Sequence, residues 1–288
     1  MTTIVSNDAR TAAPHVGLRN RAETAHLRVT TPRVVLSEWV KFASLRSSWI
    51  TILAALAVII GFGALAAAVA SGDVQSARPG GDPGMAGLDP TSLSLAGAQL
   101  AQIIVGILGV LAVSGEYSSG MIRATLAAVP RRLPVLWGKV VVIGVVGLVV
   151  AVPAAFGAFF LGQSILGAGA NAALSDDGVL REVLGTGVYL AAIGLLGLAL
   201  GALLRHAAGA IGALFVLLLL APNLLGLLLP DSWEPHVLPY LPSNAGSSFT
   251  SLVPPDGMLS AGTGAAVLAA WLVVLLGAAA VLLKRRDA

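Results

Sequence analysis

Six long apolar runs constrain the fold of this chain more than any other feature. Each run has about 19 to 23 residues, and at roughly 1.5 Å rise per residue an α-helix of that length crosses a hydrocarbon core of ~30 Å. A transmembrane β-barrel needs short strands of alternating polarity, whereas these runs are apolar on every face. The sequence therefore predicts an all-α integral membrane protein with six transmembrane helices, at about 49–70, 95–113, 140–161, 183–204, 207–229 and 265–283.

The basic residues fall almost entirely on one side of these six spans. Of the 17 Lys and Arg residues, all but Arg78 and Arg181 lie in the terminal segments or in the loops after the second and fourth spans. Basic residues concentrate in cytoplasmic loops, so we expect a multi-pass protein of the cytoplasmic membrane with both termini in the cytoplasm. Basic groups that face anionic lipid explain the net positive charge without a nucleic-acid partner.

The segment before the first span predicts two parts. Residues 1–32 are polar and lack the apolar core of a signal peptide, which favours a disordered cytoplasmic tail ahead of one six-span domain over 33–288. Residues 34–48 carry apolar and polar side chains at roughly helical spacing, which predicts an amphipathic interfacial helix with Trp39 at headgroup depth and Glu38 and Lys41 among its polar residues. The alternative is a simple basic flank to the first span.

A polar, basic island, GEYSSGMIRATLAAVPRR, joins the second and third spans at 115–132. Glu116 and Tyr117 are expected where the second span leaves the membrane. Ser118 or Ser119 can cap a short helix that follows over about 120–129.

The second half of the island carries the signals of a helix end. Pro130 cannot continue the helix, and Arg131 and Arg132 are placed near its negative C-terminal dipole. Four apolar residues are expected to share one side of this helix, namely Met121, Ile122, Leu126 and Val129. The alternative is an ordinary positive-inside loop that happens to be helical.

The outer half of the chain predicts irregular structure. The loop over 230–264 contains Trp233, Tyr240 and Phe249, and short re-entrant or interfacial helices would place these aromatic rings at the outer headgroups. Pro153 is expected to kink the third span, and Pro222 to disturb the outer end of the fifth.

The chain lacks the sequence signs of catalysis and of ion coupling. No predicted span has an Asp, Glu, Lys, Arg or His side chain in its interior, the nearest being Lys139 at an end, which disfavours proton-coupled antiporters, cation channels and intramembrane metalloproteases. Neither a GxxxxGK(S/T) phosphate-binding loop nor an HExxH motif occurs, so we expect no catalytic, metal or cofactor site in this chain. Asp231, Ser232 and His236 share the last outer loop and are the candidate site for an alternative, a lipid-processing enzyme.

The island resembles the segment that follows the second span in ABC-2 type transporter permeases. The plan of the chain is also similar, with an interfacial helix, six spans, a minimal joint after the fourth span and a long outer loop before the sixth. Met121 stands where that family often has Thr. The pattern E-Y-x-x-G-x-I-R-x-x-L-x-x-x-P-x-R is carried by Glu116, Tyr117, Gly120, Ile122, Arg123, Leu126, Pro130 and Arg132.

The resemblance implies that the island holds a coupling helix that rests on a separate ATP-binding subunit. ATP and Mg²⁺ would bind to that partner, and two permease copies, expected as a homodimer, would complete the transporter. By the same resemblance, the residues that contact or orient the ATP-binding subunit would be Glu116, Tyr117, Gly120, Ile122, Arg123, Pro130, Arg131 and Arg132, with Glu38, Trp39 and Lys41 on the interfacial helix.

The resulting hypothesis is a permease subunit of an exporter. An apolar, uncharged interior suits a hydrophobic or amphipathic substrate, such as a drug, antibiotic, peptide or lipid, better than an inorganic ion. The alternative from another class is a membrane scaffold or sensor that binds partners through the island without transport.

Overall fold

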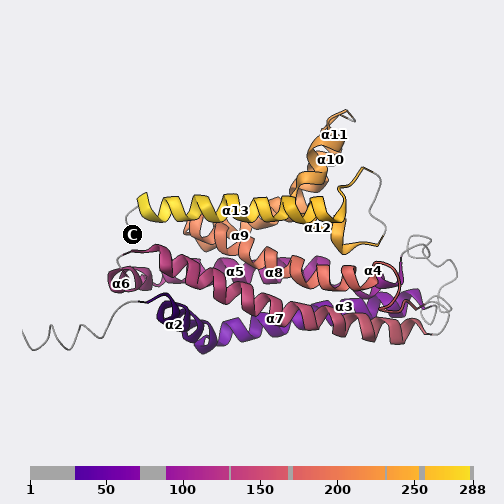
Figure 1. The fold of residues 1–288 in the computed structure, drawn as a ribbon, viewed down its shortest axis with the longest axis horizontal. Helices are drawn as coiled ribbons and strands as arrows, with labels where there is room; N and C mark the ends of the chain where they lie inside the picture. The colour runs from indigo at the N-terminus through magenta and orange to yellow at the C-terminus, as the bar shows by residue number, and fades with distance from the viewer. Residues whose placement is uncertain are drawn as a thin grey trace, which may run out of the picture.

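The structure, a computed structural model, describes residues 30–71, 89–129, 131–167, 171–230, 232–252 and 257–285. Within these ranges every regular element is a helix, and the longest helices run side by side (Figure 1). Six of them are long and apolar enough to cross a membrane, which confirms the all-helical fold with six candidate spans. They are α3 (Arg46–Ala70), α5 (Ala98–Ser118), α7 (Leu133–Leu166), α8 (Val179–Leu204), the segment from α9 to α10 (Ala207–Leu228) and α13 (Ala261–Arg285).

Helix α8 is the centre of the bundle. It packs against α5, α7, α9 and α13, and its side chains belong to both apolar cores of the structure. All six candidate spans expose some large apolar side chains, as expected of helices that face lipid or another subunit, although α8 is the most buried of the six.

Glycines set the distance between α5 and α8. A Cβ atom on Gly197 would meet the backbone carbonyl of Gly106, and a Cβ on Gly109 would meet the carbonyl of Gly194. Small residues allow such backbone contact between helices in lipid. These glycines therefore determine how closely α5 and α8, the two most buried candidate spans, approach each other.

We expect Gly197→Ala to lower the stability of the fold by about 1–3 kcal/mol, because the added methyl group forces two backbones apart. Gly61→Ala in α3 is the matched control, since no atom outside its own helix lies within 4 Å of the added Cβ. Ala is a better helix former than Gly, so this control should unfold at the same temperature or higher. Thermal unfolding of both variants in one detergent checks the prediction, and equal midpoints would contradict it.

One end of the bundle gathers several short elements. Helices α2 (Thr31–Ser44) and α6 (Met121–Ala128) lie there, next to the C-terminal end of α13 (Figure 1). The opposite end carries α4 (Pro90–Ser94). Both ends of the described chain are thus at the α6 end of the bundle.

The segment before the first span differs in detail from the prediction over 34–48. Helix α2 begins at Thr31 and ends at Ser44, and the backbone is extended at Leu45 before α3 starts at Arg46. Two helices therefore occupy the region where one was expected. Residues 1–29, the greater part of the predicted tail, lie outside the described residues.

The fifth span is irregular next to Pro222, as predicted. It consists of α9 (Ala207–Phe215), a π-helical stretch η2 (Val216–Leu220) and α10 (Ala221–Leu228). Proline lacks the N–H group that an α-helix needs, and a π-turn is one way to absorb that loss. By contrast, α7 continues through Pro153 as one helix.

The loop before the sixth candidate span contains the short helices that the sequence predicts, but one aromatic residue does not lie where it was expected. These helices are α11 (Glu234–Val237), η3 (Leu238–Tyr240) and α12 (Pro242–Thr250), and Trp233 and Tyr240 are exposed. Phe249 is buried and packs edge-on against Tyr189 of α8, with ring centroids 6.5 Å apart. The headgroup position predicted for Phe249 is wrong, because α12 packs against α8 and α13.

Candidate functional site

Helix α2 turns a charged side chain toward the bundle. Its buried face consists of Val34, Glu38 and Phe42, while Trp39 is 43% exposed. Gly138 of α7 makes this approach close, since a Cβ there would lie 3.3 Å from Cγ1 of Val34 and 3.4 Å from Cγ of Glu38. The helical spacing of α2 suggests that Glu38 lies on an outer polar face. The structure instead places Glu38 on the buried face.

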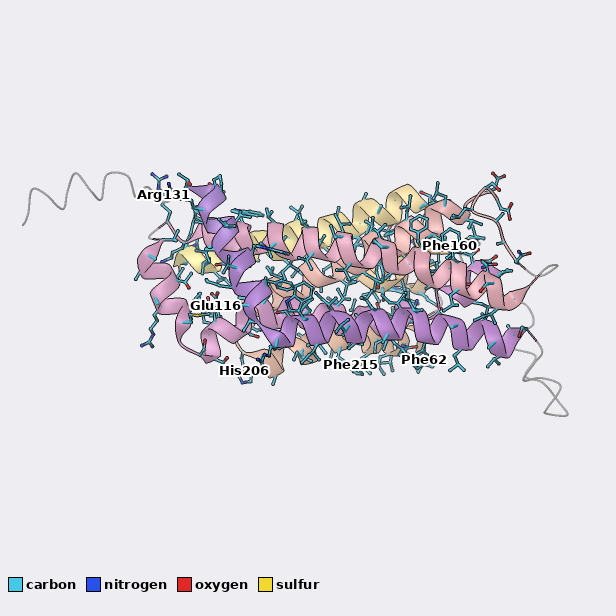
Figure 2. All side chains as sticks on the ribbon, turned by 90° about the horizontal axis from the view of Figure 1, so that it is seen from below. Phe62, Glu116, Arg131, Phe160, His206 and Phe215 are labelled. Carbon is cyan, nitrogen blue, oxygen red and sulfur yellow. The ribbon has the colours of Figure 1, made fainter. Side chains whose placement is uncertain are left out.

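Glu38 belongs to a buried ion-pair cluster, by which we mean Glu38, Lys41, Glu116 and Lys139. Nζ of Lys139 lies 2.6 Å from Oε2 of Glu38 and 2.8 Å from Oε1 of Glu116. Nζ of Lys41 lies 2.8 Å from Oε1 of Glu38 and 3.0 Å from the same Oε1 of Glu116. Two carboxylates and two ammonium groups thus balance their charges at the α6 end of the bundle, where Figure 2 labels Glu116.

The cluster joins four helices. Lys41 also donates to Oγ1 of Thr125 in α6, at 3.3 Å, and Lys139 donates to the carbonyl of Ala112 in α5, at 3.1 Å. Each ammonium group therefore uses all three of its N–H donors. Through these bonds α2, α5, α6 and α7 are held to one another.

The surroundings of Lys41 favour its charged form. Burial acts to lower the pKa of Lys41, but the hydrogen bonds and charge attraction of Glu38 and Glu116 outweigh it and raise that pKa above its ordinary value. The stability that Lys41 contributes is thus fully present below its ordinary pKa of 10.5, taken for the unfolded chain, and is lost only as pH rises through the higher folded pKa.

The cluster lies within two of the helices that form candidate spans, near the ends where the sequence places Glu116 and Lys139. Helix α5 continues to Ser118 and α7 begins at Leu133, so both Glu116 and Lys139 lie inside helices that are apolar enough to span. The predicted spans were drawn from apolar runs, which exclude charged residues, whereas α5 and α7 extend past those runs and include Glu116 and Lys139. The available signal was the Glu38–Lys41 spacing, which places two opposite charges one turn apart.

The island forms a helix, α6, but its start differs from the prediction. Gly120 precedes the helix with φ of 72°, a backbone conformation that favours glycine, and no side chain caps it. The hydroxyls of Ser118 and Ser119 instead donate to the carbonyl of Gly115, at 3.1 and 2.8 Å. The predicted serine cap is therefore wrong, since both side chains serve the end of α5.

Helix α6 has one buried side, formed by Ile122 and Leu126. Met121, which was expected on that side, is 44% exposed, and Val129 lies beyond the last helical residue. Arg123 is exposed on α6. The helix thus presents an apolar side to the bundle and at least one basic residue away from it.

The basic end of the island divides between solvent and bundle. Arg131 is exposed at the edge of the structure (Figure 2). Arg132 precedes α7, and its Nη1 donates to the carbonyl of Leu283 in α13, at 3.4 Å. Pro130 lies outside the described residues.

Tyr117 links α5 to the joint between α8 and α9. The guanidinium carbon of Arg205 lies 5.3 Å from the centre of the Tyr117 ring, within the range of a cation–π contact. The tight hairpin after the fourth span is thereby held beside the start of the island.

A second buried polar group, missed by the sequence reasoning, lies at the opposite end. Glu182 of α8 is fully buried and accepts from the hydroxyl of Ser92 in α4, at 2.9 Å. Gln163 of α7 donates to Oγ of Ser94, at 3.0 Å, and accepts from the backbone N–H of Ala172. These bonds fix α4 between α7 and α8.

Two residues of the alternative enzyme site are exposed, and the third is not described by the structure. Asp231 lies outside the described residues, and Ser232 and His236 are exposed at α11. Among the described residues, no group of three or more His, Asp or Glu side chains could hold a metal ion.

The chain is similar in sequence to a known family. A family model described as "ABC-2 family transporter protein" matches residues 38–288. The chain belongs to this family. No curated protein matches it.

The ABC-2 match spans the features described above. It begins at Glu38 and so includes the whole ion-pair cluster, α6 and all six candidate spans. The chain is therefore a multi-pass membrane protein and a membrane component of an ABC transporter. Membership in the family implies association with an ATP-binding subunit.

Proposed function

We propose that this ABC-2 chain is the permease of an exporter and that a separate ATP-binding subunit drives it through α6. The observation that carries the proposal is the bond between Thr125 of α6 and Lys41, which ties the short helix to the ion-pair cluster. A displacement of α6 is thereby passed to α2, α5 and α7 together.

The chain around α6 supports a mechanical role. Only Ser119 and Gly120 separate α5 from α6, and residues 129–132 separate α6 from α7. Ile122 and Leu126 hold the buried side of α6 against the bundle. A helix with such short connections cannot move without moving the two spans that flank it.

The same proposal places the α6 end of the bundle in the cytoplasm. The basic residues of α2, α6 and the end of α13 favour this orientation, and exposed Trp39 and Trp49 suit a headgroup region beside α2. ATP and Mg²⁺ would be held by the partner subunit, and a second copy of this chain would pack against the exposed apolar faces.

A hydrophobic or amphipathic substrate fits the chain best. Between its two polar ends the described bundle is lined mainly by apolar side chains, and the buried Tyr189 hydroxyl already donates to Gln102, so little is left to replace the hydration shell of an inorganic ion. Direction and substrate class both belong to the proposal.

Purification of the tagged chain from its own membranes in a gentle detergent tests the proposal. We expect a P-loop ATPase to be recovered in near-equal amount, and the complex to move an amphipathic solute across vesicle membranes only with ATP. Recovery of the chain alone under crosslinking would overturn the partner assignment. A stable complex without ATP-dependent movement would instead favour the scaffold alternative.

A further inference from the structure

A cavity of about 440 Å³ lies beside the ion-pair cluster, between α2, α3, α5 and α7. Its volume is within the range of small-molecule sites. Ser48 and Thr51 of α3 and Met121 of α6 also line it. Its apolar walls are formed by Phe42, Leu45, Leu108, Leu111, Val142 and Ile143.

The hydrogen bonds of the cluster define what this cavity can recognise. Lys41 and Lys139 each donate three hydrogen bonds inside the protein and have no donor left for a ligand. Both oxygens of Glu38 accept from lysines. Oε2 of Glu116 differs, because it is buried without a hydrogen-bond partner in the described structure.

Glu116 is only 4% exposed and is one of the residues that line the cavity, so a donor that enters the cavity beside it could supply the partner that Oε2 lacks. A buried acceptor without a partner costs about 1–3 kcal/mol, which a ligand with an O–H or N–H group would relieve. An anionic head group would find no donor on the lysines and would meet a carboxylate.

The balance of charge selects further. The cluster holds two positive and two negative groups, so a cationic ligand would leave an uncompensated buried charge beside two lysines. We propose that the cavity binds a neutral amphiphile whose apolar body fills the space and whose hydroxyl or amide group donates to Oε2 of Glu116. This site is a property of the chain itself and does not depend on what is transported or on the ATP-binding subunit.

Photolabelling of the purified chain with three long-chain probes tests the site. The probes share one photoreactive alkyl chain and differ in the head group, which is an alcohol, its methyl ether or a carboxylate. We expect saturable labelling of α3 and α5 by the alcohol, with roughly fivefold weaker labelling by the ether, which lacks only the donor. The carboxylate should label least.

Two variants separate the cavity from general contact with detergent. Ala112→Phe fills the cavity from α5 and should reduce labelling by the alcohol roughly tenfold, because the added ring takes the space of the ligand. Ala269→Phe adds the same ring to an exposed position of α13 and should leave the labelling unchanged. Thermal unfolding of both variants verifies that they are folded.

Several results would overturn the inference. They are equal labelling by alcohol and ether, stronger labelling by the carboxylate, or labelling that survives Ala112→Phe. Labelling that never saturates would show that water, and not an amphiphile, satisfies Glu116. If the site is confirmed, lipid extraction of the purified chain shows where its ligand comes from. A neutral lipid that co-purifies with the chain would come from the bilayer. If none co-purifies, the ligand would be a neutral amphiphile taken up from solution.

Discussion

Glu116→Ala should lower the free energy of unfolding by about 3–5 kcal/mol, the effect of removing one partner from a buried ion pair. Glu116 accepts from both lysines of the cluster, and its loss leaves Lys139 buried with an excess positive charge. Chemical or thermal unfolding in detergent measures the change. Since the same residues join α2 to α5 and α7, transport activity should fall with stability.

A double-mutant cycle distinguishes this charge effect from simple loss of packing. Lys139→Met alone should also destabilise, because it leaves two carboxylates near one lysine. Combined with Glu116→Ala it leaves the Glu38–Lys41 pair, 2.8 Å apart and balanced in charge. The double variant should therefore cost less than the sum of the single variants, by about 1–3 kcal/mol.

The control for this cycle is Asp177→Ala. Asp177 is exposed in the turn before α8, and its removal should change stability by no more than about 0.5 kcal/mol. Additive effects of the two cluster variants, or a loss as large for Asp177→Ala, would show that the cluster does not act as a unit.

The sequence was sufficient for the six candidate spans because length and hydrophobicity alone determine whether a helix can cross a membrane. It was insufficient for their ends. Predicted spans stopped at 113 and began at 140, since the pattern treats Glu116 and Lys139 as charges that must face water. In the structure each neutralises the other at 2.8 Å, so both helices continue past them.

The same limit explains the errors on α2 and α6. A helical pattern places Glu38 on the outer face of α2, but its ion-pair partner Lys139 lies 101 residues away in the sequence and turns it inward. A Ser before a helix predicts a cap, yet Gly120 at positive φ leaves both serines with the preceding helix. Local propensity found these helices, whereas long-range contacts decided their orientation and their ends.

Arg123→Glu tests the proposal that the exposed side of α6 contacts the ATP-binding subunit. Glu116 is buried, so it can orient α6 but offers little surface to another protein. Arg123 is exposed on α6 beside the buried side of Ile122 and Leu126, where a basic group would meet an acidic surface of the ATP-binding subunit. Charge reversal should reduce the co-purified ATPase roughly tenfold or more, because like charges across an interface cost several kcal/mol.

The unfolding temperature separates this effect from that of the cluster. Arg123→Glu changes an exposed residue, so it should leave stability within about 0.5 kcal/mol while it removes the partner. Glu116→Ala should instead lower the stability of the isolated chain before any effect on the recovery of the ATPase. Arg181→Glu reverses an exposed basic residue at the start of α8, at the opposite end of the bundle, and should retain the ATPase. Full recovery of the partner with Arg123→Glu would mean that α6 transmits force through its apolar residues or through Arg131, and not through Arg123.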